Sequence, residues 1–283
     1  VPTGSNFTSK RSKARKLLLQ IASHLTGFRI SNDATLIATS GRCEFRNKGI
    51  DAFIDSCNIL RTELKGSEKE IVAFILVPGW TSGPRQDLQA SLKSKDIARL
   101  PDSVITHNLH NDSNDIIKQK LDFLDFKNDD CDNVKIIYAP SYLNGNDGIF
   151  NLPYYDVLIG FDLTIFPSYY EPWGYTPLES TAFSVPTITT NLAGFGQWVI
   201  DEIGTDCTKS GVVVVSRNDS NYDETLRDIV NNVEDYIGKS KQDITKIRKA
   251  AKATSQKATW DKFIGYYMAV YESAVKKHNK RNI

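Results

Sequence analysis

The stretch LTIFPSYYEPWGYTPLESTAFSVPTITTNLAGFG (residues 163–196) decides the fold. Its apolar run Leu163 to Phe166 and its β-branched run Thr187 to Thr190 predict two strands. The segment between them predicts a loop and then a helix from Pro177 to Phe183. A strand, a helix and a second strand in this order are typical of a parallel sheet that is buried on both faces.

The same alternation continues on both sides of this stretch. It predicts six strands in one doubly wound sheet, at Thr35–Thr39, Ile71–Val77, Val134–Tyr138, Leu163–Phe166, Thr187–Thr190 and Gly211–Val215. Helices are predicted between the strands, at Ile50–Lys65, Asn114–Phe126, Tyr154–Gly160, Pro177–Phe183 and Phe195–Glu202.

The ends of the chain predict helices only. A basic amphipathic helix, Ser9–Leu25, precedes the sheet, and helices at Asp223–Tyr236, Asp243–Thr254 and Thr259–Lys277 follow it. We therefore predict an α/β, Rossmann-like domain over residues 34–218, with a helical lead-in over 1–33 and a C-terminal helical tail over 219–283. An insertion over residues 78–111, with one helix at Gln86–Ser94, interrupts the domain.

Composition excludes several classes of function. The chain has 283 residues with 35 Lys+Arg against 34 Asp+Glu, so no field of one sign attracts nucleic acid or an anionic membrane. The longest apolar runs, such as Ile71–Val77, fall far short of the ~20 residues of a membrane helix. The basic cluster Lys10 to Lys16 is interpreted as a solvated helix face.

The cysteines favour a reducing, cytoplasmic location. Cys43, Cys57, Cys131 and Cys207 lie far apart, without the spacing of a zinc site or of a disulfide framework. We find no secretory signal and no acidic metal cluster. The only Met is Met268, which predicts an excised piece or a processed product.

Unusual residues follow three of the predicted strands. Two of these loops carry charged side chains, and the third, after Thr190, carries Gly194 and Gly196, which permit close approach either of a ligand or of helix and sheet. After the first strand, Arg42, Arg46 and Lys48 put cations beside a helix N-terminus, which suits a diphosphate; a solvated loop with chance cations is the alternative. After the fourth strand, Glu171 and Glu179 could both face a cleft and bind sugar hydroxyls.

The same fourth-strand loop could also bind a phosphate. Thr176 is predicted to cap the helix, which leaves the backbone N–H groups of Gly174, Tyr175 and Thr176 free for a phosphate. The alternative has Glu179 on an outer helix face and Trp173 packed in the core.

Four strings closely resemble the glycogen synthases of the animal and fungal type: GRCEFRNKG, VITHNLHNDSND, FPSYYEPWGYTPLE and PTITTNLAGFG, all between Ala34 and Trp198. The resemblance implies one half of a GT-B fold and transfer of glucose, with retention, from UDP-glucose or ADP-glucose to the 4-hydroxyl of an α-1,4-glucan. It implies no cofactor. It also implies two partners, the glucan acceptor and a missing N-terminal domain, and leaves an oligomer open.

By this resemblance, catalytic roles fall to Arg42 and Lys48, which would hold the diphosphate, and to Glu171, which would meet the glucose hydroxyls. The resemblance also implies a substrate-binding set: Glu179 for the ribose, the amides of Gly174, Tyr175 and Thr176 for the phosphate, Tyr154 for a stacked uracil, and Trp173. The alternative for Tyr154 is an aromatic side chain of the core.

The sequence departs from the family's pattern in its regulatory helix. The stretch Ile244 to Lys257 holds only one arginine, Arg248, so regulation by glucose 6-phosphate is not expected.

Two alternatives stay open: a non-catalytic nucleotide- or sugar-binding module on the same fold, and a phosphorylase of the same architecture. The second would need a lysine for pyridoxal phosphate, and none stands in the Glu171 loop.

Overall fold

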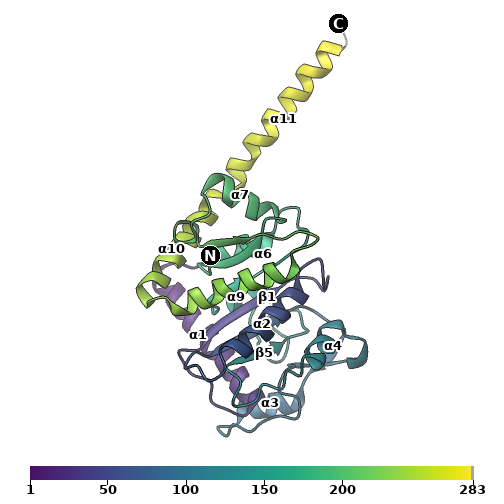
Figure 1. Ribbon diagram of the computed structural model, residues 1–283, viewed down its shortest axis with the longest axis vertical. Helices are drawn as coiled ribbons and strands as arrows, with labels where there is room; N and C mark the ends of the chain where they lie inside the picture. Colours follow the sequence, from purple (N-terminus) through teal and green to yellow (C-terminus); the bar gives the residue numbers. More distant parts are fainter. Residues whose placement is uncertain (282–283) are drawn as a thin grey trace.

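The computed structural model describes residues 1–281, with one parallel sheet between two layers of helices (Figure 1). Six strands form the sheet in the order β5-β2-β1-β6-β7-β8. They are β1 (Thr35–Ser40), β2 (Ile71–Leu76), β5 (Val134–Tyr138), β6 (Leu163–Ile165), β7 (Thr187–Thr190) and β8 (Val212–Val215). All neighbouring strands are parallel, so the six predicted strands and the doubly wound α/β class are confirmed.

The strand order reverses between β1 and β6. From β1 the chain adds β2 and β5 on one side, whereas β6 is followed by β7 and β8 on the other side. In open α/β sheets, connections that leave two neighbouring strands toward opposite sides open a crevice at the carboxyl ends of those strands, where ligands bind. The loops after β1 and β6 therefore border the expected site.

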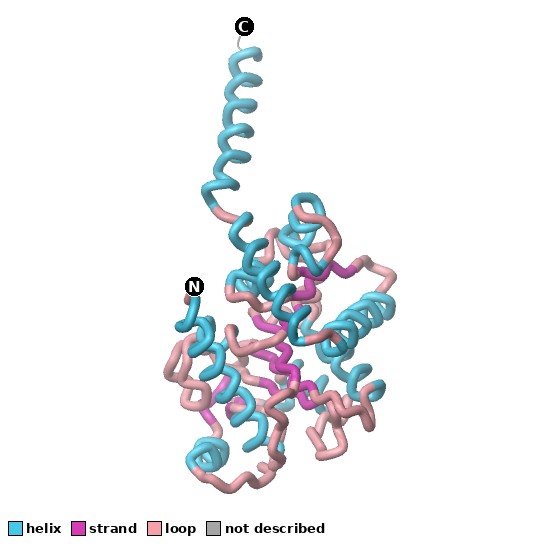
Figure 2. The backbone as a smooth tube through the Cα atoms, turned by 90° about the vertical axis from the view of Figure 1, so that its left-hand side faces the viewer, coloured by secondary structure: helices cyan, strands magenta, loops and turns pink. Residues whose placement is uncertain are grey.

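Helices cover both faces of the sheet because its strands are apolar on both faces (Figure 2). In β2, Ile71, Ala73 and Ile75 pack on one side with α2 (Ile50–Glu63), α4 (Ile116–Phe123) and α9 (Tyr222–Gly238). The intervening residues of β2 pack on the other side with α1 (Gly4–Thr26), α3 (Gln86–Lys93) and α5 (Tyr154–Leu158). The lead-in helix α1 thus shares the core of the sheet.

The remaining helices lie toward the β8 edge and the C-terminus. They are α6 (Tyr175–Ala182), α7 (Gly194–Glu202), α8 (Cys207–Ser210), α10 (Lys241–Lys257) and α11 (Trp260–Arg281). α10 packs against α6 and α8, whereas α11 projects away from the body (Figure 1). Its side chains Tyr266, Met268, Val270 and Tyr271 are each at least half exposed.

The insertion contains more structure than predicted. The helix at Gln86 is present, but a two-stranded antiparallel sheet of β3 (Thr81–Pro84) and β4 (His107–Leu109) accompanies it. The residues of β3, Thr-Ser-Gly-Pro, have no apolar alternation, so the sequence gives no strand signal there. Two further elements were not predicted, the helix α8 and the 3₁₀ turn η1 (Asp112–Asn114), because four and three residues are too few to show a helical period. The helix α4 that follows η1 is shorter than predicted.

The prediction that Lys10 to Lys16 form a solvated helix face is wrong for three of its cations. Lys10 pairs with Asp156 at 2.7 Å, while Arg11 and Arg15 both pair with Asp162, at 2.5 and 2.6 Å. Charge alone does not reveal such partners, because Asp156 and Asp162 are distant in sequence and reach α1 only through the fold.

Candidate functional site

The loops after β1 and β6 touch each other at the carboxyl edge of the sheet. Gly49 ends the first loop with a φ of +69°, and a Cβ there would overlap the carbonyl oxygen of Pro167. The backbone N–H of Tyr169 donates to the carbonyl oxygen of Asn47 at 2.8 Å. Glycine is therefore required for the two loops to lie this close.

The contact brings Lys48 and Glu171 together. The Lys48 Nζ donates a short hydrogen bond to the Glu171 Oε2, and both side chains are mostly buried, with 17% and 19% exposure. A cation and a carboxylate from different loops thus meet at the point where the strand order reverses. Such a pair can part to bind a phosphate and a sugar hydroxyl, one with each partner.

Arg42 lies on the same loop as Lys48, but its side chain is mostly exposed to solvent. Its side chain is 79% exposed, and its guanidinium pairs with the Glu44 Oε1 at 3.0 Å. Asn47 donates to the other oxygen of Glu44 at 2.7 Å, and this bond, with the nearby cations Arg42 and Lys48, lowers the pKa of Glu44. Sequence reasoning missed Glu44, although its place two residues after Arg42 was a usable signal.

The N-terminus of α6, which follows the loop after β6, has free backbone N–H groups. The helix begins at Tyr175 and its N-cap is Gly174, at φ +105°, so the prediction of Thr176 as the cap is wrong. No group among residues 1–281 accepts a hydrogen bond from the backbone N–H of Tyr175 or Thr176. These amides and the helix dipole favour an anion.

Glu179 lies inside α6 and is held by a neighbour that the sequence analysis did not select. The Tyr155 hydroxyl donates to the Glu179 Oε1 at 2.7 Å, and the Tyr155 ring stacks on Phe183 with centroids 5.1 Å apart. The hydrogen bond to the carboxylate, with a contribution from burial, raises the pKa of Tyr155 to about 12. The position of Tyr155 next to Tyr154 was the one available signal.

Tyr154 and Trp173 have different surroundings. The Tyr154 hydroxyl shares a hydrogen bond of 2.8 Å with the Ser40 Oγ at the end of β1, and burial raises its pKa. The Trp173 ring packs with an aromatic cluster of Phe195, Trp198 and Phe263. Packing of Trp173 in the core was the alternative from the sequence, and the substrate-binding role of both residues stays a prediction.

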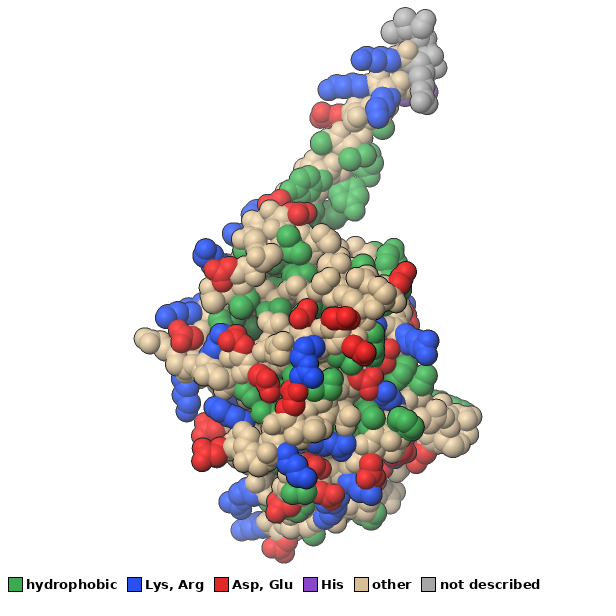
Figure 3. All heavy atoms as spheres, viewed as in Figure 1, with side chains coloured by type: hydrophobic (Ala, Val, Ile, Leu, Met, Phe, Trp, Pro, Cys, Tyr) green, Lys and Arg blue, Asp and Glu red, His purple; other side chains and the backbone are tan. Residues whose placement is uncertain are grey.

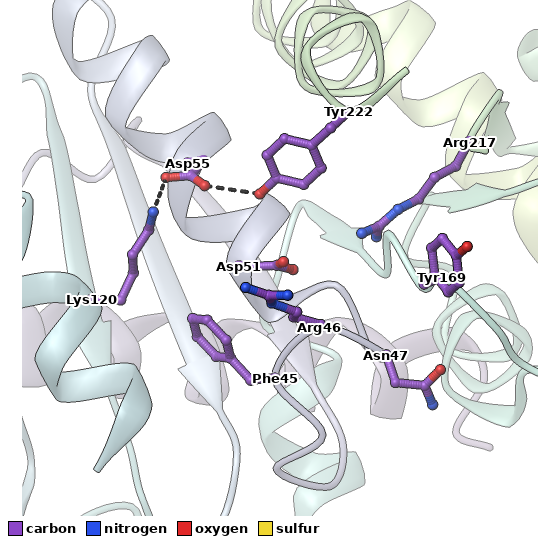
Figure 4. A pocket seen from close by; sticks show the side chains of 9 residues that line it. All are labelled: Phe45, Arg46, Asn47, Asp51, Asp55, Lys120, Tyr169, Arg217 and Tyr222. Atoms are coloured by element: carbon purple, nitrogen blue, oxygen red, sulfur yellow. Dashed lines mark hydrogen bonds and ion pairs between the residues drawn. The ribbon is translucent and has the colours of Figure 1, made fainter. Parts of the chain in front are cut away.

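A pocket of about 680 Å³ adjoins the loops that follow β1 and β6 (Figure 4). The loop that carries Arg42 and Lys48 also supplies three of its lining residues, Phe45, Arg46 and Asn47. The other lining side chains come from α2, α4, α9 and the loops after β6 and β8: Asp51, Asp55, Lys120, Tyr169, Arg217 and Tyr222.

The described part of the chain offers neither a cluster of metal ligands nor a helix suited to a membrane. Residues 1–281 hold no group of three or more His, Cys, Asp and Glu side chains that could bind a metal ion. None of the helices in this range combines the length and the hydropathy that crossing a bilayer takes.

Comparisons with known proteins give related sequences and folds. The family model of glycogen synthase matches residues 86–282. Glycogen [starch] synthase isoform 2 of Saccharomyces cerevisiae is 31% identical over 299 residues, which cover 84% of this chain and 42% of the yeast protein. The chain spans between 39% and 42% of the length of the fungal and mammalian relatives that it matches.

Two solved structures share the fold at low identity. The catalytic domain of starch synthase IV from Arabidopsis thaliana, bound to ADP and acarbose, aligns at a TM-score of 0.53 and 15% identity, over 96% of this chain and 44% of that one. Anabaena Alr3699/HepE, in complex with UDP and glucose, aligns at a TM-score of 0.51 and 14% identity, over 96% of this chain and 53% of that one. The fold is thus that of one half of a GT-B glycosyltransferase. Within that class, the chain belongs to the glycogen synthase family.

Proposed function

We propose that this chain is the donor-binding half of a retaining glucosyltransferase that extends an α-1,4-glucan from a nucleotide-glucose. The observation that carries the proposal is the Lys48–Glu171 pair, formed by two loops at the switch point of the sheet in a chain of this family. The free amides of Tyr175 and Thr176 and the exposed guanidinium of Arg42 support it as further groups for a diphosphate.

In the proposed reaction, Lys48 leaves Glu171 and, with Arg42, binds the diphosphate. The bond between the anomeric carbon and the diphosphate oxygen breaks, and its electron pair stays on the diphosphate. The acceptor 4-hydroxyl oxygen bonds to the anomeric carbon from the same side, and its proton passes to the departing phosphate oxygen. Cations aimed at the developing negative charge contribute most to such a step, while Glu171 would hold the glucose hydroxyls.

The donor is proposed to be a uridine nucleotide without a metal cofactor. Tyr154 supports uridine as the aromatic group for the base, while the two structural neighbours were solved with UDP and with ADP. Arg42 and Lys48 supply the positive charge that a metal would otherwise bring, so chelation with EDTA should leave UDP affinity unchanged.

Activity is proposed to require a second domain, and the exposed apolar side of α11 supports a further packing partner. The four free thiols of the described residues support a reducing compartment. The glucan acceptor is proposed to enter between the two halves. This chain on its own is expected to bind UDP and to transfer glucose hardly at all.

Isothermal titration of the chain with UDP tests the proposal. Loss of a charged hydrogen-bonding partner is worth about 1.5–3 kcal/mol, so Arg42→Ala should weaken UDP binding by about 10- to 100-fold. Tyr154→Ala should also weaken it. Arg227→Ala is the matched control, because Arg227 is exposed on α9 and pairs with Glu63. Absence of UDP binding, or equal affinity of Arg42→Ala and Arg227→Ala, would refute the proposal.

A further inference from the structure

One arginine, Arg217, is bonded to two other loops at the carboxyl edge of the sheet. It stands two residues after β8 and is only 4% exposed. Its Nη1 donates a short hydrogen bond to the carbonyl oxygen of Pro167, in the loop after β6. Its backbone N–H donates to the Oδ1 of Asn191, directly after β7, at 2.6 Å. Arg217 thus joins the loops that follow β6, β7 and β8.

The guanidinium of Arg217 also lies against the loop after β1. A Cβ on Gly49 would lie 2.9 Å from the Arg217 Nη1 and would overlap the carbonyl oxygen of Pro167. Gly49 directly follows Lys48, and Pro167 precedes Glu171 by four positions. The guanidinium is therefore placed where the two loops that carry the Lys48–Glu171 pair meet.

Two aromatic rings hold the guanidinium in place. Its central carbon lies 5.5 Å from the ring centroid of Tyr169 and 5.8 Å from that of Tyr222, and Figure 4 shows Arg217 directed toward the space between them. A guanidinium within about 6 Å of an aromatic centroid is attracted by the negative face of the ring. The Tyr222 ring is itself fixed, because its hydroxyl donates to the Asp55 Oδ2 at 2.8 Å.

Packing alone does not account for a cation at this position. Burial lowers the pKa of Arg217, and the Asp51 carboxylate and Tyr222 offset this effect only in part. A buried charge is costly, and an apolar side chain of similar volume often stabilises a fold equally well. What an apolar side chain cannot supply is the hydrogen bond to Pro167. The role of Arg217 therefore lies in how the loops are arranged.

We propose that Arg217 is a positioning residue for the diphosphate of the donor. The inference rests on the proposed function, in which Lys48 binds that diphosphate. By holding Pro167 against Gly49, Arg217 fixes the loop of Lys48 relative to the loop of Glu171, so the cation is in place before the nucleotide arrives. Arg217 acts through Lys48 and makes no bond to the nucleotide.

A double-mutant cycle, measured by titration of the full chain with UDP, tests the inference. Arg217→Met keeps a long side chain between the rings but removes the donor, and should weaken UDP binding about tenfold. In a Lys48→Ala background the same substitution should weaken UDP binding by less than about twofold, because the group that Arg217 positions is already gone. Arg217→Lys keeps a donor for Pro167, so its UDP affinity should stay within about threefold of the parent value.

Arg85→Met is the matched control for the loss of a buried arginine. Arg85 is 6% exposed and donates to the carbonyl oxygen of Ile105 at 2.8 Å, within the insertion. Its replacement should leave UDP affinity unchanged, whatever it does to the free energy of unfolding. Urea unfolding of both methionine variants measures that free energy independently of nucleotide binding.

The outcomes separate the inference from the proposed function. Equal losses of UDP affinity in Arg85→Met and Arg217→Met would trace the effect to stability and overturn the inference. An Arg217→Met effect that is as large in the Lys48→Ala background would overturn it too, because Arg217 would then act independently of Lys48. Arg217→Lys that folds but binds UDP as weakly as Lys48→Ala would have the same consequence.

The parent chain and Arg42→Ala complete the comparison. UDP binding that Arg42→Ala weakens and Arg217→Met leaves unchanged would refute the inference alone. A parent chain that binds no UDP would refute the proposed function, and with it the inference that rests on it.

Discussion

At the scale of single residues, the carboxylates of the site differ in how they are held. Glu171 is paired with a cation, Lys48, whereas Glu179 accepts from a neutral hydroxyl, that of Tyr155. The Tyr155 bond engages one Glu179 oxygen and leaves the other for a ligand hydroxyl. Tyr155 is thus a positioning residue for the proposed ribose contact.

Tyr155→Phe should weaken UDP binding about 5- to 10-fold, because a hydrogen bond to a charged group is lost while the stacked ring remains. Titration with UDP and with its 2′,3′-dideoxy analogue checks the cause. The loss should shrink for the analogue, which has no ribose hydroxyls for Glu179 to accept from. Equal losses for both nucleotides would contradict a role through Glu179.

At the scale of elements, Asp162 contacts both α1 and the start of β1. It pairs with Arg11 and Arg15 and accepts from the backbone N–H of Leu36 at 2.9 Å. Burial would raise the pKa of Asp162, but the two guanidinium groups and this backbone bond hold it below its usual range. Arg248 on α10 donates to Phe161 beside them, and burial lowers its pKa to about 10.

Asp162→Asn should lower the free energy of unfolding by about 2–4 kcal/mol near neutral pH, because two guanidinium groups lose their partner. A carboxyl group with a lowered pKa stabilises the fold fully above its unfolded pKa, about 3.9. The gap between parent and variant should therefore narrow as the pH falls below about 4. Urea unfolding of both proteins across that pH range measures the difference between their free energies of unfolding. A difference independent of pH would contradict the ion-pair explanation.

At the scale of the whole molecule, the body and α11 are stabilised differently. The body carries charges of both signs over a buried sheet, whereas apolar side chains gather on the projecting helix (Figure 3). The first turn of α11 reaches the body, where Phe263 contacts Trp173 and Trp198 at centroid distances of 5.0 and 6.0 Å.

Truncation after Gly265 should leave the free energy of unfolding within about 0.5 kcal/mol of the parent value, because the side chains of residues 266–280 are exposed. Phe263→Ala should instead cost about 1–3 kcal/mol through loss of aromatic packing on Trp173. Chemical unfolding followed by tryptophan fluorescence compares the two. A larger loss for the truncation than for Phe263→Ala would show that the projecting part of α11 packs on the body.

The sequence by itself determined the sheet and the loops of the site. Runs such as Ile71 to Leu76 are long enough and apolar enough to be buried strands, and local periodicity carries that information. The positions of Lys48 and Glu171 followed, because loops after parallel strands share one edge.

Only the tertiary structure decided which side chains act together. The Tyr155–Glu179 bond, the Asp162 cluster, the β3–β4 pairing and the pocket of Figure 4 join residues from separate elements. The physical reason is that these contacts depend on how helices and loops pack across the sheet. Local propensity and spacing fix an element, but they do not fix what that element meets.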